Sequence, residues 1–289
     1  MNLGVAVGNL GFSIGRLVDP SEHAALVYRI GDSAERLGFD SVWVGDHLAL
    51  PRHPSTPYPY GGGSAMVDPV TSMLEPFAVL AALAGRTRRV KLGLGVVVAP
   101  YRHPLVSAKL IATIDALSGG RMVVGVGTGW MPEEFAAVGA SFAERGRDTD
   151  ACLAYWREAF ATGEVDGMTI LPRPVQRPHP PIWVGGNGAA AMRRAVAFAD
   201  GWDAPYAEPA QLRAGIARLH ERCRQMGRDP ATLRLSVRGI AADTVDTGLL
   251  DICAALGVSE IGVTVPYRDA DLAVATLERL AHRCASHLG

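Results

Sequence analysis

The sequence predicts an α/β protein in which eight parallel strands close into a (β/α)8 barrel, also called a TIM barrel. Three observations support this class. Short apolar runs alternate with segments of helical period along the whole chain, the number of such runs reaches eight, and the central segment Val90–Trp130 has the pattern of a β-α-β unit. Because regular β-α alternation demands a parallel sheet, and eight strands favour closure over an open sheet, we expect one barrel domain spanning residues 1–289.

The central unit shows the signals most clearly. Val90–Val98 is an apolar, glycine-spaced run that suits a strand buried on both faces. Leu105–Leu117 carries apolar residues at helical spacing, and Ser118-Gly119-Gly120 is a typical helix stop. Arg121–Val126 is the next apolar strand, and it should lie parallel to the first.

The remaining elements follow in order with similar signals. The helix expected up to Leu37 begins at Asp19-Pro20-Ser21-Glu22, where a proline and acidic residues occupy the first turn. The eight expected strands are Leu3–Val7, Ser41–Val44, Val90–Val98, Arg121–Val126, Ile182–Val184, Asp200–Asp203, Leu233–Ile240 and Ile261–Val265. The further helices are Glu75–Ala84, Leu105–Leu117, Glu133–Val138, Asp148–Thr162, Ala189–Ala199, Ala210–Met226, Gly248–Leu256 and Ala270–His287. Two long segments, Leu48–Val67 and Gly163–Pro181, are expected to be irregular loops or insertions.

Composition narrows the function classes. The formal net charge is −1, which argues against nucleic acid or an anionic membrane as the main partner and leaves a small molecule. The N-terminus has no apolar signal region, and no apolar run is long enough to span a bilayer, so we expect a cytoplasmic enzyme. The four cysteines form no CxxC pair, so neither a disulfide framework nor a metal site is indicated.

Gly45-Asp46-His47 follows the second strand, at the barrel edge where active sites form. A carboxylate and an imidazole there are suitable for acid–base chemistry. The alternative is that Asp46 caps the loop and His47 packs beneath it.

Two glycine-rich segments end further strands at the same edge. Gly125–Gly129 follows the fourth strand. A dinucleotide site would require an acid ending the next strand about twenty residues later, and the chain has no such strand end there. The glycines are therefore better explained as leaving room for a flat ligand on the strand ends. Gly185-Gly186-Asn187-Gly188 ends the fifth strand and opens a helix, a place suited to a phosphate or merely to a tight turn. The nearby Arg193 and Arg194 are expected to face solvent. Glu133 and Glu134 are acids in a first helical turn, where they favour the helix dipole.

Several motifs resemble those of the luciferase-like monooxygenase superfamily, in order and over most of the chain to Trp202. They are Gly45-Asp46-His47, Gly95–Val98 with Pro100–Pro104, Leu117–Arg121, Gly125–Trp130, Pro180–Gly186 and Asp200–Trp202. The resemblance implies a barrel with a flavin or deazaflavin at the strand C-termini, and it is closest to the branch that uses the deazaflavin coenzyme F420. It further implies a homodimer.

The resemblance also implies roles for individual residues. His47 would face the reacting centre as a catalytic residue, and Glu134 would anchor the site near the ring. Cofactor contacts would come from Asp46, Gly95, Val96, Val97, Gly127, Thr128, Gly129, Gly185, Gly186 and Asn187, with the coenzyme phosphate on Gly185 and Gly186. The Gly95–Val96 peptide would be cis and form a bulge behind the ring. Independently of the resemblance, hydride transfer needs water to be excluded, and the Leu48–Val67 loop is expected to do this. The family often has a Glu in the helix after Arg145-Gly146-Arg147, where this chain has Asp150-Ala151, and this departure puts the usual salt bridge in doubt.

The expected activity is therefore hydride transfer between coenzyme F420 and a small organic substrate. The alternative is a monooxygenase of the same fold that uses reduced FMN and oxygen. Trp130 stands where some deazaflavin enzymes have Glu, which argues against sugar-phosphate dehydrogenase chemistry. A metal-dependent hydrolase would require a His-x-His motif after the first strand, where this chain has Gly8-Asn9-Leu10. A Schiff-base aldolase would need a lysine inside the barrel, and Lys91 is at the wrong end of its strand. A non-catalytic flavin-binding relative is the remaining alternative.

Overall fold

The computed structural model describes residues 1–7, 19–53, 55–57, 59, 72–205, 208–267 and 269–286. Residues 54, 58 and 60–67 of the expected covering loop lie outside this set, so its closure over the site stays a prediction. Gly8-Asn9-Leu10 lies outside it as well.

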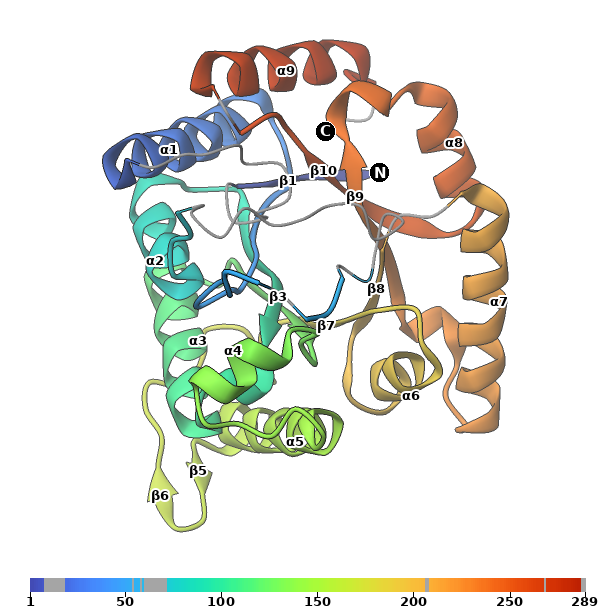
Figure 1. Ribbon diagram of the computed structural model, residues 1–289. Coiled ribbons are helices and arrows are strands. Elements are labelled where there is room, and N and C mark those ends of the chain that lie inside the picture. The colour runs from blue at the N-terminus through green and yellow to red at the C-terminus, as the bar shows by residue number, and fades with distance from the viewer. Residues whose placement is uncertain are drawn as a thin grey trace.

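Eight parallel strands close into a barrel, which confirms the predicted fold class (Figure 1). Around the barrel the order is β1, β10, β9, β8, β7, β4, β3 and β2, and the pairing of β1 with both β2 and β10 closes the sheet. The strands are β1 Asn2–Ala6, β2 Ser41–Val44, β3 Lys91–Val98, β4 Met122–Gly127, β7 Ile182–Gly185, β8 Gly201–Pro205, β9 Arg234–Ala241 and β10 Val258–Thr264.

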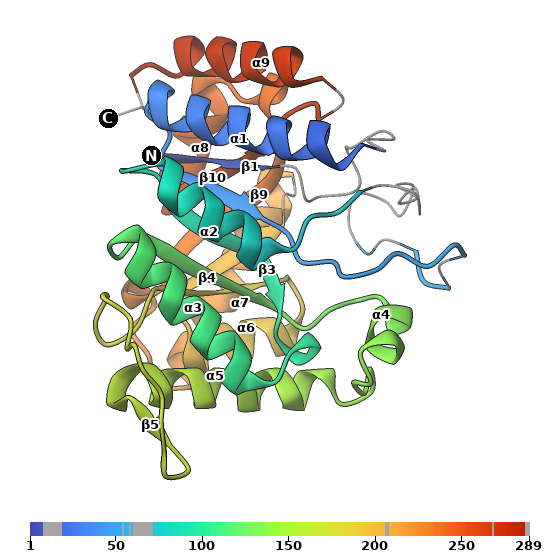
Figure 2. The ribbon, with the colours of Figure 1, turned by 90° about the vertical axis from the view of Figure 1, so that its left-hand side faces the viewer.

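Helices surround the barrel as an outer layer, and they run roughly along its axis for α1, α2, α3 and α5 (Figure 2). Their bounds are α1 Pro20–Leu37, α2 Pro76–Arg86, α3 Pro104–Ser118, α4 Pro132–Ala137, α5 Arg145–Thr162, α6 Ala189–Phe198, α7 Pro209–Gln225, α8 Thr247–Ala255 and α9 Ala270–Arg283. Short 3-10 turns occupy Ala99–Tyr101, Pro230–Thr232 and Ala242–Thr244.

The end signals of α1 act as the sequence predicts. The Asp19 side chain accepts a hydrogen bond of 2.7 Å from the Ser21 N–H, and Pro20 occupies the first turn, where a missing N–H costs nothing. Gly38 ends the helix with φ of +82°, a conformation that favours glycine. Most other boundaries differ from expectation by one to three residues, because helix and strand ends are weakly specified by local sequence.

Bulky side chains fill the barrel interior. Trp43, Val123 and Trp183 form a buried cluster there, separate from the larger core between strands and helices. Glycines on neighbouring strands make room for the two indoles, since a Cβ at Gly93 would overlap Trp43 and one at Gly201 would overlap Trp183. The barrel is therefore a packed core, and ligands must enter at its ends.

The Gly163–Pro181 segment corrects one prediction. It contains a two-stranded antiparallel hairpin, β5 Glu164–Val165 and β6 Met168–Thr169, rather than irregular chain alone. Asp166 and Gly167 form its turn with φ of +51° and +73°. An Asp-Gly pair readily adopts positive φ at both central positions, which is what a two-residue hairpin needs.

No described helix combines the length and the apolarity needed to cross a bilayer. The cytoplasmic location and the homodimer stay predictions. The four cysteines are buried free thiols.

Candidate active site

A cavity of about 730 Å³ opens at the C-terminal ends of the strands. Its walls come from β2, β3, β4, β7, β8 and β9, together with Trp130 and the start of α5. Ten of the sequence-predicted residues line it: Asp46, His47, Gly95, Val96, Gly127, Thr128, Gly129, Gly185, Gly186 and Asn187. This volume is within the range of about 300–1,000 Å³ that is usual for ligand pockets.

Val97 and Glu134 do not line the cavity. Val97 is 1% exposed and packs in the main core, because successive side chains on a strand point to opposite faces. Glu134 lies behind His47 and Tyr101, which both line the cavity.

One wall of the cavity is flat and made of backbone. The Gly95–Val96 peptide is cis, as expected, and the register between β3 and β4 shifts between Leu94 and Val97. The Val96 side chain lies over the neighbouring strands, with its methyl groups 2.5 Å and 3.1 Å from the points that a Cβ would occupy at Gly127 and Gly185. A larger residue at Gly127 would therefore displace Val96. The glycines and Val96 form a smooth surface against which a planar ring system can stack.

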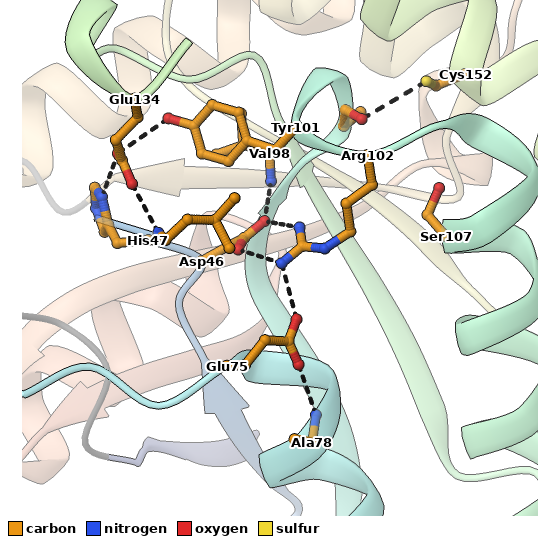
Figure 3. A network of polar contacts seen from close by, with 12 residues as sticks. Asp46, His47, Glu75, Ala78, Val98, Tyr101, Arg102, Ser107, Glu134 and Cys152 are labelled. Carbon is orange, nitrogen blue, oxygen red and sulfur yellow. Dashed lines mark hydrogen bonds and ion pairs between the residues drawn. The ribbon is translucent and has the colours of Figure 1, made fainter. Parts of the chain in front are cut away.

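His47 is held from behind by a buried carboxylate (Figure 3). Its Nδ1 lies 2.7 Å from Glu134 Oε2, which also accepts a hydrogen bond of 3.0 Å from the Tyr101 hydroxyl. The other oxygen of Glu134 accepts from the backbone N–H groups of Leu48 (2.8 Å) and Ala49 (3.3 Å). Four donors therefore meet one carboxylate. The other three hold Glu134 in place, and Glu134 in turn orients the imidazole of His47.

The charge state of Glu134 determines the tautomer of His47. Burial alone would raise the pKa of Glu134, but the hydrogen bond and charge of His47, with the two backbone N–H groups, lower it below the ordinary value. Burial and the Glu134 charge raise the pKa of Tyr101, so its hydroxyl keeps its proton. With Glu134 ionised, Nδ1 of His47 carries the hydrogen of this contact. The side chain of His47 is 11% exposed, and its ring meets the edge of Trp130 at 6.1 Å between centroids.

Asp46 is committed to an ion pair within the protein. Arg102 donates to both carboxylate oxygens at 2.7 Å and 2.9 Å, and the Val98 N–H donates at 3.0 Å (Figure 3). Arg102 also donates to Glu75, which caps the start of α2 through Ala78. Burial lowers the pKa of Arg102, but the hydrogen bonds and charges of Asp46 and Glu75 raise it overall. Asp46 thus ties β2 to the end of β3 and supports the cis segment from behind.

The opposite end of the cavity is the start of α6. Gly186 has φ of +112°, and Gly188 precedes the helix without a side-chain cap. Arg194, expected to face solvent, is instead 3% exposed and lines the cavity, where it donates to Asp150 (2.5 Å) and to the Gly146 carbonyl (3.0 Å). Asp150 also pairs with Arg193, so the salt bridge that the sequence put in doubt is present and joins α5 to α6.

The barrel interior holds a polar network that the sequence did not predict. Arg238 donates to Asp203 (2.8 Å) and Glu260 (3.0 Å), and its guanidinium lies over the Trp43 ring. Burial raises the pKa of Asp203 despite the charge of Arg238 and the hydrogen bond from Ser236. Asp203 and Arg238 line the cavity. The sequence signal that could have revealed this network is that Asp203, Arg238 and Glu260 are charged residues within otherwise apolar strands.

Across the described ranges, no group of three or more His, Cys, Asp or Glu side chains could hold a metal ion. The site therefore offers a flat wall, a positioned imidazole and a helix start, all within one cavity.

Comparison with known proteins adds a family match. A family model described as luciferase-like monooxygenase matches residues 10–245. An uncharacterised protein of Mycobacterium tuberculosis (strain ATCC 25618 / H37Rv) is 33% identical over 254 residues, which cover 82% of this chain and 85% of the relative. A phthiodiolone/phenolphthiodiolone dimycocerosates ketoreductase of Mycobacterium kansasii is 30% identical over 230 residues, or 72% of this chain and 61% of the relative.

Solved structures share the fold. The monooxygenase RslO1 of Streptomyces bottropensis superposes with a TM-score of 0.80 at 22% identity and covers 100% of both chains. An F420-dependent secondary alcohol dehydrogenase superposes with a TM-score of 0.69 at 16% identity and covers 96% of this chain and 97% of its own. At these identities the likeness concerns the fold.

Proposed function

The chain belongs to the luciferase-like monooxygenase family, and from its site we propose that it is an oxidoreductase that transfers a hydride between coenzyme F420 and a small organic substrate. Within that class we favour the interconversion of a secondary alcohol and a ketone. The observation that carries the proposal is the His47–Glu134–Tyr101 arrangement beside the flat wall.

The cavity fits a deazaflavin. The smooth surface of Val96, Gly127 and Gly185 would back the tricyclic ring, since any side chain at those glycines would occupy the stacking space. The open N–H groups at the start of α6, after Gly186 and Asn187, would hold the phosphate. When bound, the deazaflavin would supply or accept the hydride.

His47 would manage the proton that accompanies the hydride. Alcohol oxidation releases the hydroxyl proton, and ketone reduction takes one up, so the substrate oxygen needs a partner that can do both. Nε2 of His47 has this capacity, because Glu134 fixes Nδ1 as the protonated nitrogen and stabilises the imidazolium that forms. Trp130 packs edge-on to the imidazole at the cavity wall and would limit the approach of water to it.

The activities of two similar proteins support this substrate class without assigning it. The Mycobacterium kansasii relative is a ketoreductase, and one of the structural neighbours is an F420-dependent secondary alcohol dehydrogenase. Both names describe carbonyl–alcohol chemistry, which is the chemistry that a positioned acid–base group serves.

A second candidate is an FMN-dependent monooxygenase. It is favoured by the closer superposition with the monooxygenase RslO1 and by a flat wall that would back an isoalloxazine equally well. We rank this candidate second, because the activation of oxygen by reduced FMN does not by itself explain the positioned His47–Glu134 pair.

The two candidates differ in the cofactor that they bind. In parallel titrations with oxidised F420 and with FMN, we expect micromolar or tighter binding of F420 and much weaker binding of FMN. Tight binding of FMN without binding of F420 would overturn the proposal and favour the monooxygenase.

A further inference from the structure

A second cavity of about 440 Å³ lies between α6 and the C-terminal half of α7, outside the barrel. The two helices are neighbours at the lower right of Figure 1. We call this cavity the α6/α7 groove. Its lining residues are Asn187, Ala189, Met192, Ala217, Arg218, Glu221, Arg222 and Gln225.

The groove and the main cavity share one lining residue. Asn187 lines both cavities, and it stands at the start of α6, next to the expected phosphate position. A ligand whose phosphate rests there can therefore continue from the barrel mouth into the groove. A ligand that ends at its phosphate leaves the groove empty.

The groove carries positive charge. Within the described part of the chain, neither Arg218 nor Arg222 forms an ion pair with a carboxylate. The single acid in the lining, Glu221, is already paired with Arg224 at 2.7 Å and accepts a further hydrogen bond from Gln225 at 3.1 Å. Two guanidinium groups are thus available to an anionic ligand, and guanidinium groups suit carboxylates because their donors match the two oxygens.

We propose that the α6/α7 groove binds the carboxylate-bearing tail of the deazaflavin, with Arg218 and Arg222 as its partners; this inference rests on the proposed function. Beyond its phosphate, coenzyme F420 carries a lactyl group and a chain of glutamates, each with a free carboxylate. FMN ends at its phosphate. The groove would therefore favour the binding of F420 over FMN through contacts that lie away from the ring.

The test compares coenzyme forms with and without glutamates, with FMN as a third ligand. Equilibrium binding is followed by cofactor fluorescence at low and high salt, for the unmodified enzyme and for Arg218→Gln, Arg222→Gln and the double variant. The matched control is Arg213→Gln, which removes the same charge from an exposed position of α7 outside the groove. Thermal melting checks that each variant is folded.

We expect the glutamate-bearing form to bind more tightly than the tail-free form, with a difference that shrinks at high salt. Each groove substitution should weaken the binding of the tailed form by about two- to fivefold, as is usual for partly exposed charge pairs. The double variant should lose about tenfold or more, whereas Arg213→Gln and all binding of the tail-free form should be unchanged.

Other outcomes overturn the inference in distinguishable ways. Equal binding of tailed and tail-free forms would refute the groove and leave the proposed function standing. A tail effect that survives in the double variant would remove Arg218 and Arg222 from it. Binding of FMN alone would refute both the groove and the proposed function.

Discussion

Replacing Glu134 by glutamine tests the link between structure and chemistry most sharply. The side chain keeps its shape, but one oxygen becomes an NH2 group. All four contacts of Glu134 are with donors: His47 and Tyr101 on one oxygen, Leu48 and Ala49 on the other. In glutamine only the carbonyl oxygen can accept hydrogen bonds. Whichever way the amide is oriented, its NH2 group therefore faces one of the two pairs of donors, and that pair loses its acceptor.

The expected magnitude follows from these contacts. A hydrogen bond to a charged group contributes about 1.5–3 kcal/mol. Loss of the bond that orients His47 should therefore lower kcat by about 10- to 150-fold. The donors left unpaired in a buried position should lower the free energy of unfolding by about 2–4 kcal/mol. Steady-state kinetics and denaturant unfolding measure the two effects separately.

The same residue gives the unmodified enzyme a pH dependence. The pKa of Glu134 is lower in the folded protein than its ordinary value of 4.5. The unfolded chain therefore binds the proton more readily, and the contribution of Glu134 to stability is complete above the unfolded pKa. It is lost as the pH falls through the folded pKa. Unfolding measured across this acid range should show a steeper loss of stability for the unmodified enzyme than for Glu134→Gln.

Glu133 provides the matched control. It is the adjacent glutamate on α4, and its carboxylate accepts from the Ser55 N–H at 2.6 Å. Glu133→Gln should keep kcat within about twofold, since the substitution leaves all four contacts of Glu134 in place. Unchanged kcat in Glu134→Gln, or an equal loss in Glu133→Gln, would refute the assigned role of Glu134.

Three further substitutions have direct outcomes. His47→Ala should lower kcat by about 10²–10⁴-fold and change cofactor affinity little, as kinetics and titration can show; turnover at the unmodified rate would remove His47 from the mechanism. Asp150→Ala should lower the free energy of unfolding by about 3–5 kcal/mol, because it leaves Arg194 buried without its carboxylate, and a chemical melt with under 1 kcal/mol of loss would contradict this. Gly127→Ala should weaken cofactor binding by pushing Val96 toward the ring space, and adding Val96→Ala should restore part of it; no rescue in the double variant would count against the flat-wall model.

The barrel could be predicted because its signals are local and repeated. Apolar strands ending in glycine, such as Val90–Val98, and helix ends such as Asp19 and Gly38 each specify a short segment without knowledge of the rest. The parallel closure then follows from the alternation. The hairpin at Asp166-Gly167 had a readable turn signal, but the dense prolines around it suggested irregular chain.

The site was predictable only where its residues follow strand ends. His47 and Gly127 could be placed at the active edge on that basis alone. The contacts of Glu134 and Asp150 could not be derived from spacing, because they join elements 87 and 44 residues apart in the chain. The partner of such a residue is set by how helices pack in three dimensions. The Arg238 network in the barrel interior was missed for the same reason.

If the enzyme transfers a hydride to or from a deazaflavin while His47 handles the proton, the reaction needs no oxygen. The most direct test is an anaerobic single turnover, in which oxidised F420 bound to the enzyme is mixed with a panel of secondary alcohols, and reduced F420 with the matching ketones. We expect a change in deazaflavin absorbance with at least one pair, without oxygen, and a much slower change in His47→Ala. Absence of any anaerobic change, together with oxygen-dependent consumption of substrate in the presence of reduced FMN, would contradict it.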